Sequence, residues 1–341
     1  MGTSTPPCEG THENRSAMTP GPTLGTRRTR WPRRKPPASS GDLRHAEKLI
    51  TVNRTRSSLL STKQRGQVTV ARVITRSVSP VVEQLELEGD MVVTVERLAT
   101  VMRQLGMSGD PRRLAYELQR DGWLGKLRTR NAWEFLPGAR GGAHGSGDRF
   151  IEFRAQRAVD PDWGGVLAME SAASVLDLAQ RIPGQEVVAL PEDEAFPKAL
   201  TGDWRYVRVG IPDEEIAHVA GLRSWNLNGL LVGIATRPSG YRDVAGLAQW
   251  LEASTDKQGE RFNERRVGRL LAHAPAAVRQ RAAYLLLVLG NTDGAKWLMD
   301  QFPPFRMTAW FGPRQSGGRF DTLTKVNDTL LAPYLGLGGG S

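Results

Sequence analysis

The chain has 341 residues, a formal net charge of +10 and a single cysteine. This length allows two ordinary domains with hydrophobic cores. One cysteine excludes an internal disulfide, and the N-terminal residues lack the apolar core of a secretion signal. The longest apolar run, residues 282–290, is far too short to cross a bilayer. We therefore expect a cytoplasmic protein in a reducing compartment, with no membrane segment.

The positive charge is concentrated at the N-terminus. Residues 1–80 contain 15 Lys and Arg against 4 Asp and Glu, whereas residues 81–341 contain 31 against 32. Residues 1–78 are also rich in Pro, Ser, Thr and Gly, which predicts a disordered basic extension. Such an extension either adds salt-sensitive attraction to a polyanion or has no binding role, and composition favours neither.

A basic amphipathic helix is predicted over residues 110–122. Asp110 followed by Pro111 is a typical helix start, and Gly122 is a typical end. At helical spacing the apolar residues share one face, and five polar side chains fall within a separate arc of about 120°. Side chains of these types suit DNA phosphates and base edges, so the pattern is typical of a recognition helix. The five residues are Arg112, Arg113, Tyr116, Gln119 and Arg120.

The flanking segments complete a predicted winged helix-turn-helix. Residues 94–106 have apolar residues at helical spacing, and residues 80–87 predict a shorter helix before them. Residues 123–128 and 132–136 predict a β-hairpin, the wing, with which a short strand at 92–93 is expected to pair. The basic residues of the wing are Lys126, Arg128 and Arg130.

A DNA-binding role has to be weighed against a simpler one. Many surface helices carry arginines only because that face is solvated, and some winged helices bind proteins instead. Basic residues on both the helix and the hairpin, with few acidic residues between them, favour DNA. We interpret Trp123, Trp133 and Phe135 as core residues of this small domain and not as platforms for base stacking.

A glycine-rich stretch at residues 139–149 predicts a linker to a larger domain at residues 150–337. The predicted fold class is α+β: an N-terminal winged helix-turn-helix domain at residues 79–138, then a mixed α/β C-terminal domain. In this second domain we predict helices at 167–180, 241–253, 261–273, 276–289 and 297–301, and strands at 186–190, 206–211, 230–235 and 305–311.

The second domain lacks patterns typical of catalysis. Its histidines have no metal-ligand spacing, and no phosphate-binding glycine loop follows a strand. The acidic cluster at residues 192–194 is interpreted as a solvated turn rather than a cation site. We interpret His218 and His273 as ordinary surface or core residues. We therefore expect no enzyme activity, no metal and no cofactor.

Short motifs in both predicted domains match a known family. They lie at residues 118–127, 132–137, 169–173, 231–238, 279–286 and 304–310. With them, residues 80–335 resemble the AbiEi-type antitoxins of bacterial type IV toxin–antitoxin systems, in particular the actinobacterial branch. The resemblance implies a winged helix that represses its own operon, and a C-terminal domain that counteracts a nucleotidyltransferase-like toxin. The long basic N-terminus and the turn at residues 234–238 depart from the family pattern.

Two functions from different classes follow. In the first, the protein is an antitoxin and autorepressor: the five helix residues enter the major groove, and Lys126, Arg128 and Arg130 hold the DNA backbone or the adjacent minor groove. In the alternative, the protein is an interaction module that neutralises a toxin or another partner without sequence-specific DNA recognition. A hydrolase or nuclease is the least favoured. The expected partners are double-stranded promoter DNA and the cognate toxin.

Overall fold

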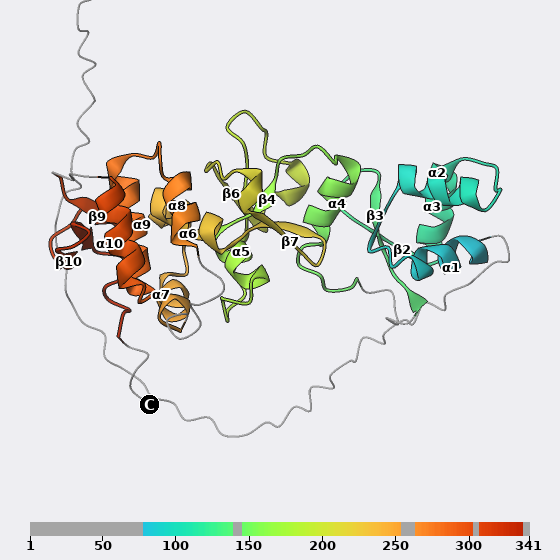
Figure 1. The fold of residues 1–341 in the computed structure, drawn as a ribbon. Helices are drawn as coiled ribbons and strands as arrows, with labels where there is room; N and C mark the ends of the chain where they lie inside the picture. The colour runs from blue at the N-terminus through green and yellow to red at the C-terminus, as the bar shows by residue number, and fades with distance from the viewer. Residues whose placement is uncertain (1–77, 139–144, 254–262, 303–306, 337–341) are drawn as a thin grey trace, which may run out of the picture. The chain divides into compact units, whose positions relative to one another are not determined.

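The computed structural model describes residues 78–138, 145–253, 263–302 and 307–336, all of which belong to one compact unit at residues 66–341. Over these ranges the chain forms ten α-helices and three β-sheets, so the fold is mixed α+β, as predicted (Figure 1). Within the same ranges, no helix is both long enough and apolar enough to span a membrane. The predicted basic extension and most of the predicted linker lie outside the described residues.

The first group of elements contains three helices and a three-stranded sheet. Helix α1 spans Ser79–Leu87, β1 Val92–Thr94, α2 Val95–Gln104, α3 Pro111–Arg120, β2 Leu124–Lys126 and β3 Ala132–Phe135. The strands pair antiparallel in the order β1-β3-β2. The helices and strands predicted over residues 80–136 are therefore present, with the two hairpin strands shorter than expected.

Side-chain caps explain where α2 and α3 begin. Thr94 Oγ1 accepts a hydrogen bond of 3.2 Å from Arg97 N, and Asp110 Oδ1 accepts one of 3.0 Å from Arg112 N. Each cap satisfies a backbone donor that has no partner inside its helix. After α3, Gly122 has a φ of +80°, which lets the chain turn away from the helix axis.

The β1–β3 sheet is covered on both faces. Trp123 and Phe135 are buried in the cluster formed with α1 to α3, and Trp133 packs against it, as predicted for core residues. The other face contacts α4 (Ile151–Val159), a helix that the sequence analysis did not predict. Phe153 of α4 is buried in a further cluster with the next sheet. Helix α4 therefore lies between the two sheets (Figure 1).

The second sheet has five strands in the order β6-β5-β4-β8-β7. Pairs β5–β6 and β4–β8 are parallel, whereas β4–β5 and β7–β8 are antiparallel. Of these strands only β5 and β6 were predicted, and β6 begins and ends earlier than expected. The bounds are β4 Val166–Leu167, α5 Met169–Val175, β5 Glu186–Ala189, the short 3-10 helix Lys198–Leu200, β6 Trp204–Val207, a second 3-10 helix Asp213–Glu215, β7 Ile216–Val219 and β8 Leu222–Trp225.

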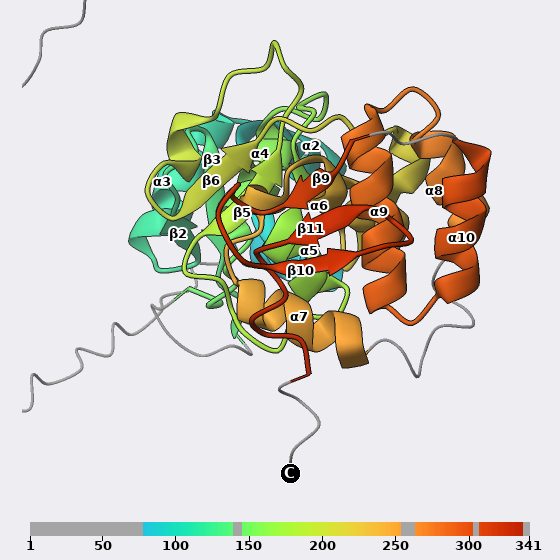
Figure 2. The same ribbon diagram turned by 90° about the vertical axis from the view of Figure 1, so that its left-hand side faces the viewer.

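The last group of elements is largely helical. The bounds are α6 Leu227–Thr236, a 3-10 helix Pro238–Gly240, α7 Val244–Ala253, α8 Glu264–Leu270, α9 Ala276–Val288, α10 Thr292–Gln301, β9 Ala309–Phe311, β10 Arg319–Asp321 and β11 Val326–Asp328. The three strands pair in the order β10-β11-β9, and α9 packs beside them (Figure 2). The predicted helices from residue 241 onwards are present with shifted ends, and the largest hydrophobic cluster lies around α6 and α9.

One predicted strand is wrong. Residues 230–235 belong to helix α6, whose start is capped by Asn226 Oδ1 accepting a 3.0 Å hydrogen bond from Gly229 N. The helix is buried on nearly every side, so its apolar residues show no one-sided helical pattern. A short continuous apolar run of this kind fits a buried strand and a buried helix equally well.

Candidate nucleic-acid interface

The polar residues of α3 lie on a face opposite to the core. Leu114, Ala115 and Leu118 are buried against α1, α2 and the sheet. Of the five predicted contact residues, Gln119 is half-buried and the other four, Arg112, Arg113, Tyr116 and Arg120, are exposed. The structure therefore places the predicted helix residues together on one accessible surface.

The arginines of this face have only weak internal partners. Arg113 Nε lies 3.2 Å from Glu117 Oε1, and its side chain is 81% exposed. Arg120 Nε lies 2.8 Å from Asp121 Oδ1, and its side chain is 62% exposed; the hydrogen bond to Asp121 raises the pKa of Arg120. Although the Asp121 side chain is only 10% exposed, both guanidinium groups are largely in contact with solvent, and such pairs contribute little stability. These guanidinium groups are therefore available to phosphates or bases.

A tryptophan connects the α3 face to the wing. Trp133 Nε1 donates a 3.0 Å hydrogen bond to Gln119 Oε1. Lys126 is the direct cross-strand neighbour of Trp133 in the β2–β3 register, so both side chains lie on the same face of the sheet. Because Trp133 contacts Gln119 of α3, this shared face is the one next to α3. Lys126 is exposed there. Trp133 was predicted only as a core residue, and its hydrogen bond to Gln119 was not predicted.

The tip of the wing is held by a buried carboxylate. Glu152 on α4 accepts hydrogen bonds from Arg128 N (2.7 Å), Thr129 N (3.2 Å) and Thr129 Oγ1 (3.0 Å). The Glu152 side chain is nearly inaccessible to solvent. Sequence reasoning missed this residue, because a single acidic residue more than 20 positions from its partners gives no local signal.

The two predicted wing residues at the tip have different environments. Arg128 Nη2 lies 2.7 Å from Asp203 Oδ2, and Arg128 Nη1 donates a 3.0 Å hydrogen bond to Thr201 O. Its guanidinium therefore contacts the segment just before β6. The Asp203 side chain is 75% exposed, and this ion pair is a weak one. Arg130 is exposed and forms no hydrogen bond or ion pair with any described residue.

Comparisons with known proteins bear on the region after this interface. Residues 165–288 match the family model of the AbiEi antitoxin C-terminal domain. This match runs from just before β4 into α9 and supports an AbiEi-type antitoxin. Among solved structures, the chain resembles the RV2827C protein from Mycobacterium tuberculosis with a TM-score of 0.65 and 26% identity, over 79% of this chain and 96% of that one. No curated protein matches the chain.

The motif at residues 169–173 lies inside this antitoxin-like region and is used for packing. Glu170 Oε2 accepts a hydrogen bond from Arg205 Nη2, and Glu170 Oε1 accepts one from Arg242 N. Ser171 Oγ accepts a 2.7 Å hydrogen bond from Val187 N and donates to Glu186 Oε2. Both carboxylates are buried. The motif therefore joins α5 to the sheet and to the start of α7, rather than presenting side chains to a partner.

Of the acidic residues at 192–194, Glu194 has an internal role. Glu192 and Asp193 form a turn, as expected. Glu194 Oε1 accepts a 3.1 Å hydrogen bond from Gly164 N. The backbone oxygen of Glu194 accepts a further bond of 2.6 Å from Arg208 Nη2. Across the described ranges no group of three or more His, Cys, Asp or Glu has an arrangement that fits a metal ion.

Proposed function

We propose that this protein is an antitoxin that also represses its own operon by binding promoter DNA. In this proposal residues 79–138 are a winged helix-turn-helix domain, and residues 150–337 counteract a nucleotidyltransferase-like toxin in the cytoplasm without enzymatic activity. The match of residues 165–288 to an antitoxin domain supports the second part. The exposed polar face of α3 is the observation that carries the first.

The DNA-binding part assigns each residue a role by its position. Helix α3 enters the major groove, where arginine and glutamine read guanine and adenine edges. Gln119 keeps its amide donors because only Oε1 is engaged, by Trp133. Lys126 and Arg130 hold phosphates from the wing. The five helix residues in contact with DNA are Arg112, Arg113, Tyr116, Gln119 and Arg120.

Arg128 has a conditional place in this proposal. Its guanidinium pairs with Asp203 and, more weakly, with Glu152, with Arg128 Nε 3.7 Å from Glu152 Oε1. It reaches a phosphate by giving up the solvent-accessible pair with Asp203. The backbone of Arg128 stays bonded to Glu152 in either case. Arg128 therefore contributes first by fixing the wing to α4 and second as a DNA contact.

The test is fluorescence anisotropy of the full chain with its own upstream duplex and with a scrambled duplex, over a salt series. We expect tighter binding to the upstream duplex. The double substitution Arg112→Ala with Arg113→Ala should weaken this binding by about 1–3 kcal/mol for each of the two arginines that reads a base. Arg265→Ala, on an exposed position of α8, is the matched control and should leave the affinity unchanged.

Equal affinity for both duplexes, unaffected by the α3 substitutions, would contradict the repressor role. The second candidate function would then be favoured, in which the protein neutralises its toxin by direct contact. The antitoxin-domain match supports this candidate independently, since it begins well after α3. Co-purification of the full chain with the toxin, at a salt concentration that abolishes DNA binding, would identify it.

A further inference from the structure

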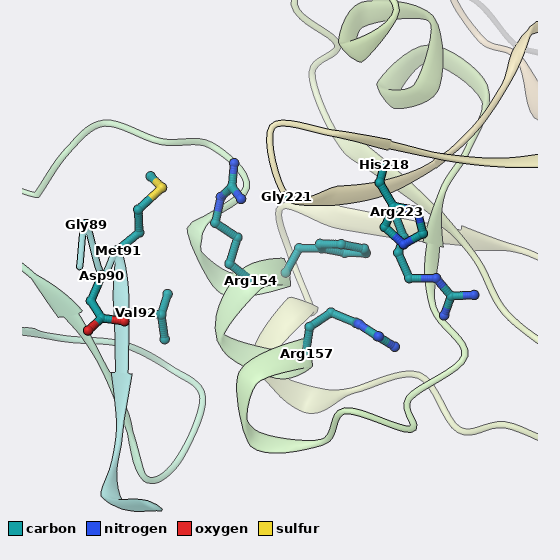
Figure 3. Close-up of a pocket in the computed structure, with 10 residues that line it drawn as sticks. Gly89, Asp90, Met91, Val92, Arg154, Arg157, His218, Gly221 and Arg223 are labelled. Carbon is teal, nitrogen blue, oxygen red and sulfur yellow. The ribbon is translucent and has the colours of Figure 1, made fainter. Parts of the chain in front are cut away.

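A pocket of about 400 Å³ lies beside α4, and basic side chains gather on one side of it (Figure 3). Arg157 comes from α4, and His218 and Arg223 come from the β7–β8 hairpin. His218 and Arg223 are direct cross-strand neighbours, so their side chains share one face of the hairpin. Figure 3 shows the side chains of Arg157 and Arg223 extending toward the same side of the pocket.

Arg157 and Arg223 line the same pocket, and their positive charges act on each other. Burial lowers the pKa of Arg157 and the neighbouring Arg223 lowers it further, whereas the carboxylates of Asp160, Asp162 and Glu194 act in the opposite direction without outweighing them. Arg157 Nη1 donates to Trp163 O, and no described carboxylate forms an ion pair with Arg157. Arg223 Nη2 donates a 2.9 Å hydrogen bond to Asp213 Oδ1, but the Asp213 side chain is 89% exposed and that pair is a weak one.

The acidic residue that lines the pocket does not neutralise this cluster. Asp90 lies on the opposite side of the pocket (Figure 3), and its carboxylate is bound by Arg97 Nε at 2.9 Å and Arg97 Nη2 at 2.7 Å. The third lining arginine, Arg154, is also engaged, by Asp148 Oδ2 at 2.8 Å. Among the residues that line the pocket Asp90 is the one carboxylate, and it is bound to Arg97 rather than to Arg157 or Arg223.

We propose that Arg157 and Arg223 form a binding site for a phosphate group. Guanidinium groups match the geometry of phosphate oxygens, and His218, which lines the same pocket, has ring nitrogens that can donate as well. The pocket is large enough to hold a mononucleotide. The same phosphate chemistry is offered by a free nucleotide or by the backbone of bound DNA. The site is separate from the α3 face and does not depend on the proposed repressor role.

The experiment titrates the full chain with inorganic phosphate and with the four nucleoside 5′-monophosphates by isothermal calorimetry. We expect saturable binding that Arg223→Gln weakens about tenfold or more, because hydrogen bonds to charged groups are among the strongest. Arg157→Lys should also weaken it, since lysine keeps the charge but lacks the planar fork. Arg265→Gln is the matched control, and circular dichroism of each variant checks folding.

A parallel arm measures the affinity of the same variants for duplex DNA over a salt series. Free-nucleotide binding that falls with Arg223→Gln and Arg157→Lys would assign the site to a small ligand. No nucleotide binding, combined with weaker and less salt-dependent duplex binding by both variants relative to Arg265→Gln, would assign it to the DNA backbone. The proposal is overturned if wild type binds no phosphate species, or if its phosphate and DNA binding are the same in the variants.

Discussion

The arginines of α3 and Arg205 of the antitoxin-like region differ in the burial of their ion pairs and in how far away in the sequence their acidic partners lie. Arg113 and Arg120 are largely exposed, and their acidic partners lie four residues and one residue away in the sequence. Arg205, with a side chain only 12% exposed, pairs with the buried Glu170, which is 35 residues away. Helix-surface pairs of the first kind leave a guanidinium available to a ligand, whereas pairs of the second kind fix one element of the fold to another.

Because of this difference, we expect loss of a buried ion pair to reduce stability and loss of an exposed arginine to leave it nearly unchanged. A buried guanidinium is destabilising unless its partner remains, and burial lowers the pKa of Arg205. An exposed guanidinium is solvated with or without its partner. Substitutions in the two regions should therefore separate stability from DNA binding.

The largest expected effect is on Glu170. Its carboxylate accepts from Arg205 Nη2, Arg242 N and Asp243 N, so Glu170→Ala leaves a buried charge and two backbone donors unpaired. Breaking one side of a buried ion pair costs about 3–5 kcal/mol of unfolding free energy. Urea denaturation of the full chain, followed by circular dichroism, measures this loss.

The matched control is Glu117→Ala, which removes the partner of Arg113 on the exposed face of α3. Its effect on the free energy of unfolding should stay within about 0.5 kcal/mol. A loss of less than 1 kcal/mol in Glu170→Ala, on the order of a single ordinary hydrogen bond, would show that the Arg205–Glu170 pair is not the fixed contact described above.

Arg120→Ala should show the reverse behaviour. The free energy of unfolding should fall by no more than about 1 kcal/mol, because the Arg120 side chain is 62% exposed, although that of its partner Asp121 is only 10% exposed. Affinity for the upstream duplex should fall by about 1–3 kcal/mol if Arg120 reads a base. Anisotropy titrations at two salt concentrations measure the affinity. A stability loss as large as that of Glu170→Ala would remove the distinction between the two regions.

The elements of residues 80–136 were predictable because local signals decide them. Asp110 and Gly122 mark the ends of α3, and its apolar face repeats at helical spacing. The sequence patterns after residue 150 were weaker. Helix α6 is apolar on nearly all sides, and β4 has only two residues. Periodicity cannot identify either of these.

The placement of the candidate site residues was predictable only in part. The surface of α3 follows from its helical spacing, but the contacts of the wing depend on tertiary structure. Glu152 anchors Thr129 from 23 residues away, and Arg128 meets Asp203 from 75 residues away. No local sequence pattern reports such distances. Arg157 and Arg223, the residues of the proposed phosphate site, likewise come from α4 and the β7–β8 hairpin, which are far apart in the sequence.

A smaller effect is expected at the wing anchor. Thr129→Val keeps the size of the side chain but removes the 3.0 Å hydrogen bond from Thr129 Oγ1 to Glu152 Oε2. The two backbone bonds to Glu152 remain, so the free energy of unfolding should fall by about 1 kcal/mol. Urea denaturation measures it, with Thr322→Val at an exposed turn as the control. No change relative to Thr322→Val would mean that the backbone bonds alone hold the wing.

The smallest effect concerns the pH dependence contributed by Glu186. Burial raises the pKa of its carboxyl above 4.5, although Ser171 and Arg149 act in the opposite direction. The folded protein therefore binds this proton more tightly than the unfolded chain does. The contribution of Glu186 to stability is present in full below the ordinary carboxyl pKa and is lost as the pH rises through the raised value.

Glu186→Gln removes this titration while keeping an oxygen that accepts from Ser171 Oγ. The stability of wild type relative to Glu186→Gln should accordingly fall as the pH rises from about 4 toward neutrality, the direction set by a carboxyl that burial makes harder to ionise. Urea denaturation at successive pH values measures the difference. A rise instead would mean that the Arg149–Glu186 pair, with Arg149 Nη1 3.1 Å from Glu186 Oε1, outweighs burial. Glu186 would then resemble Glu170, as a carboxylate whose charge the fold requires.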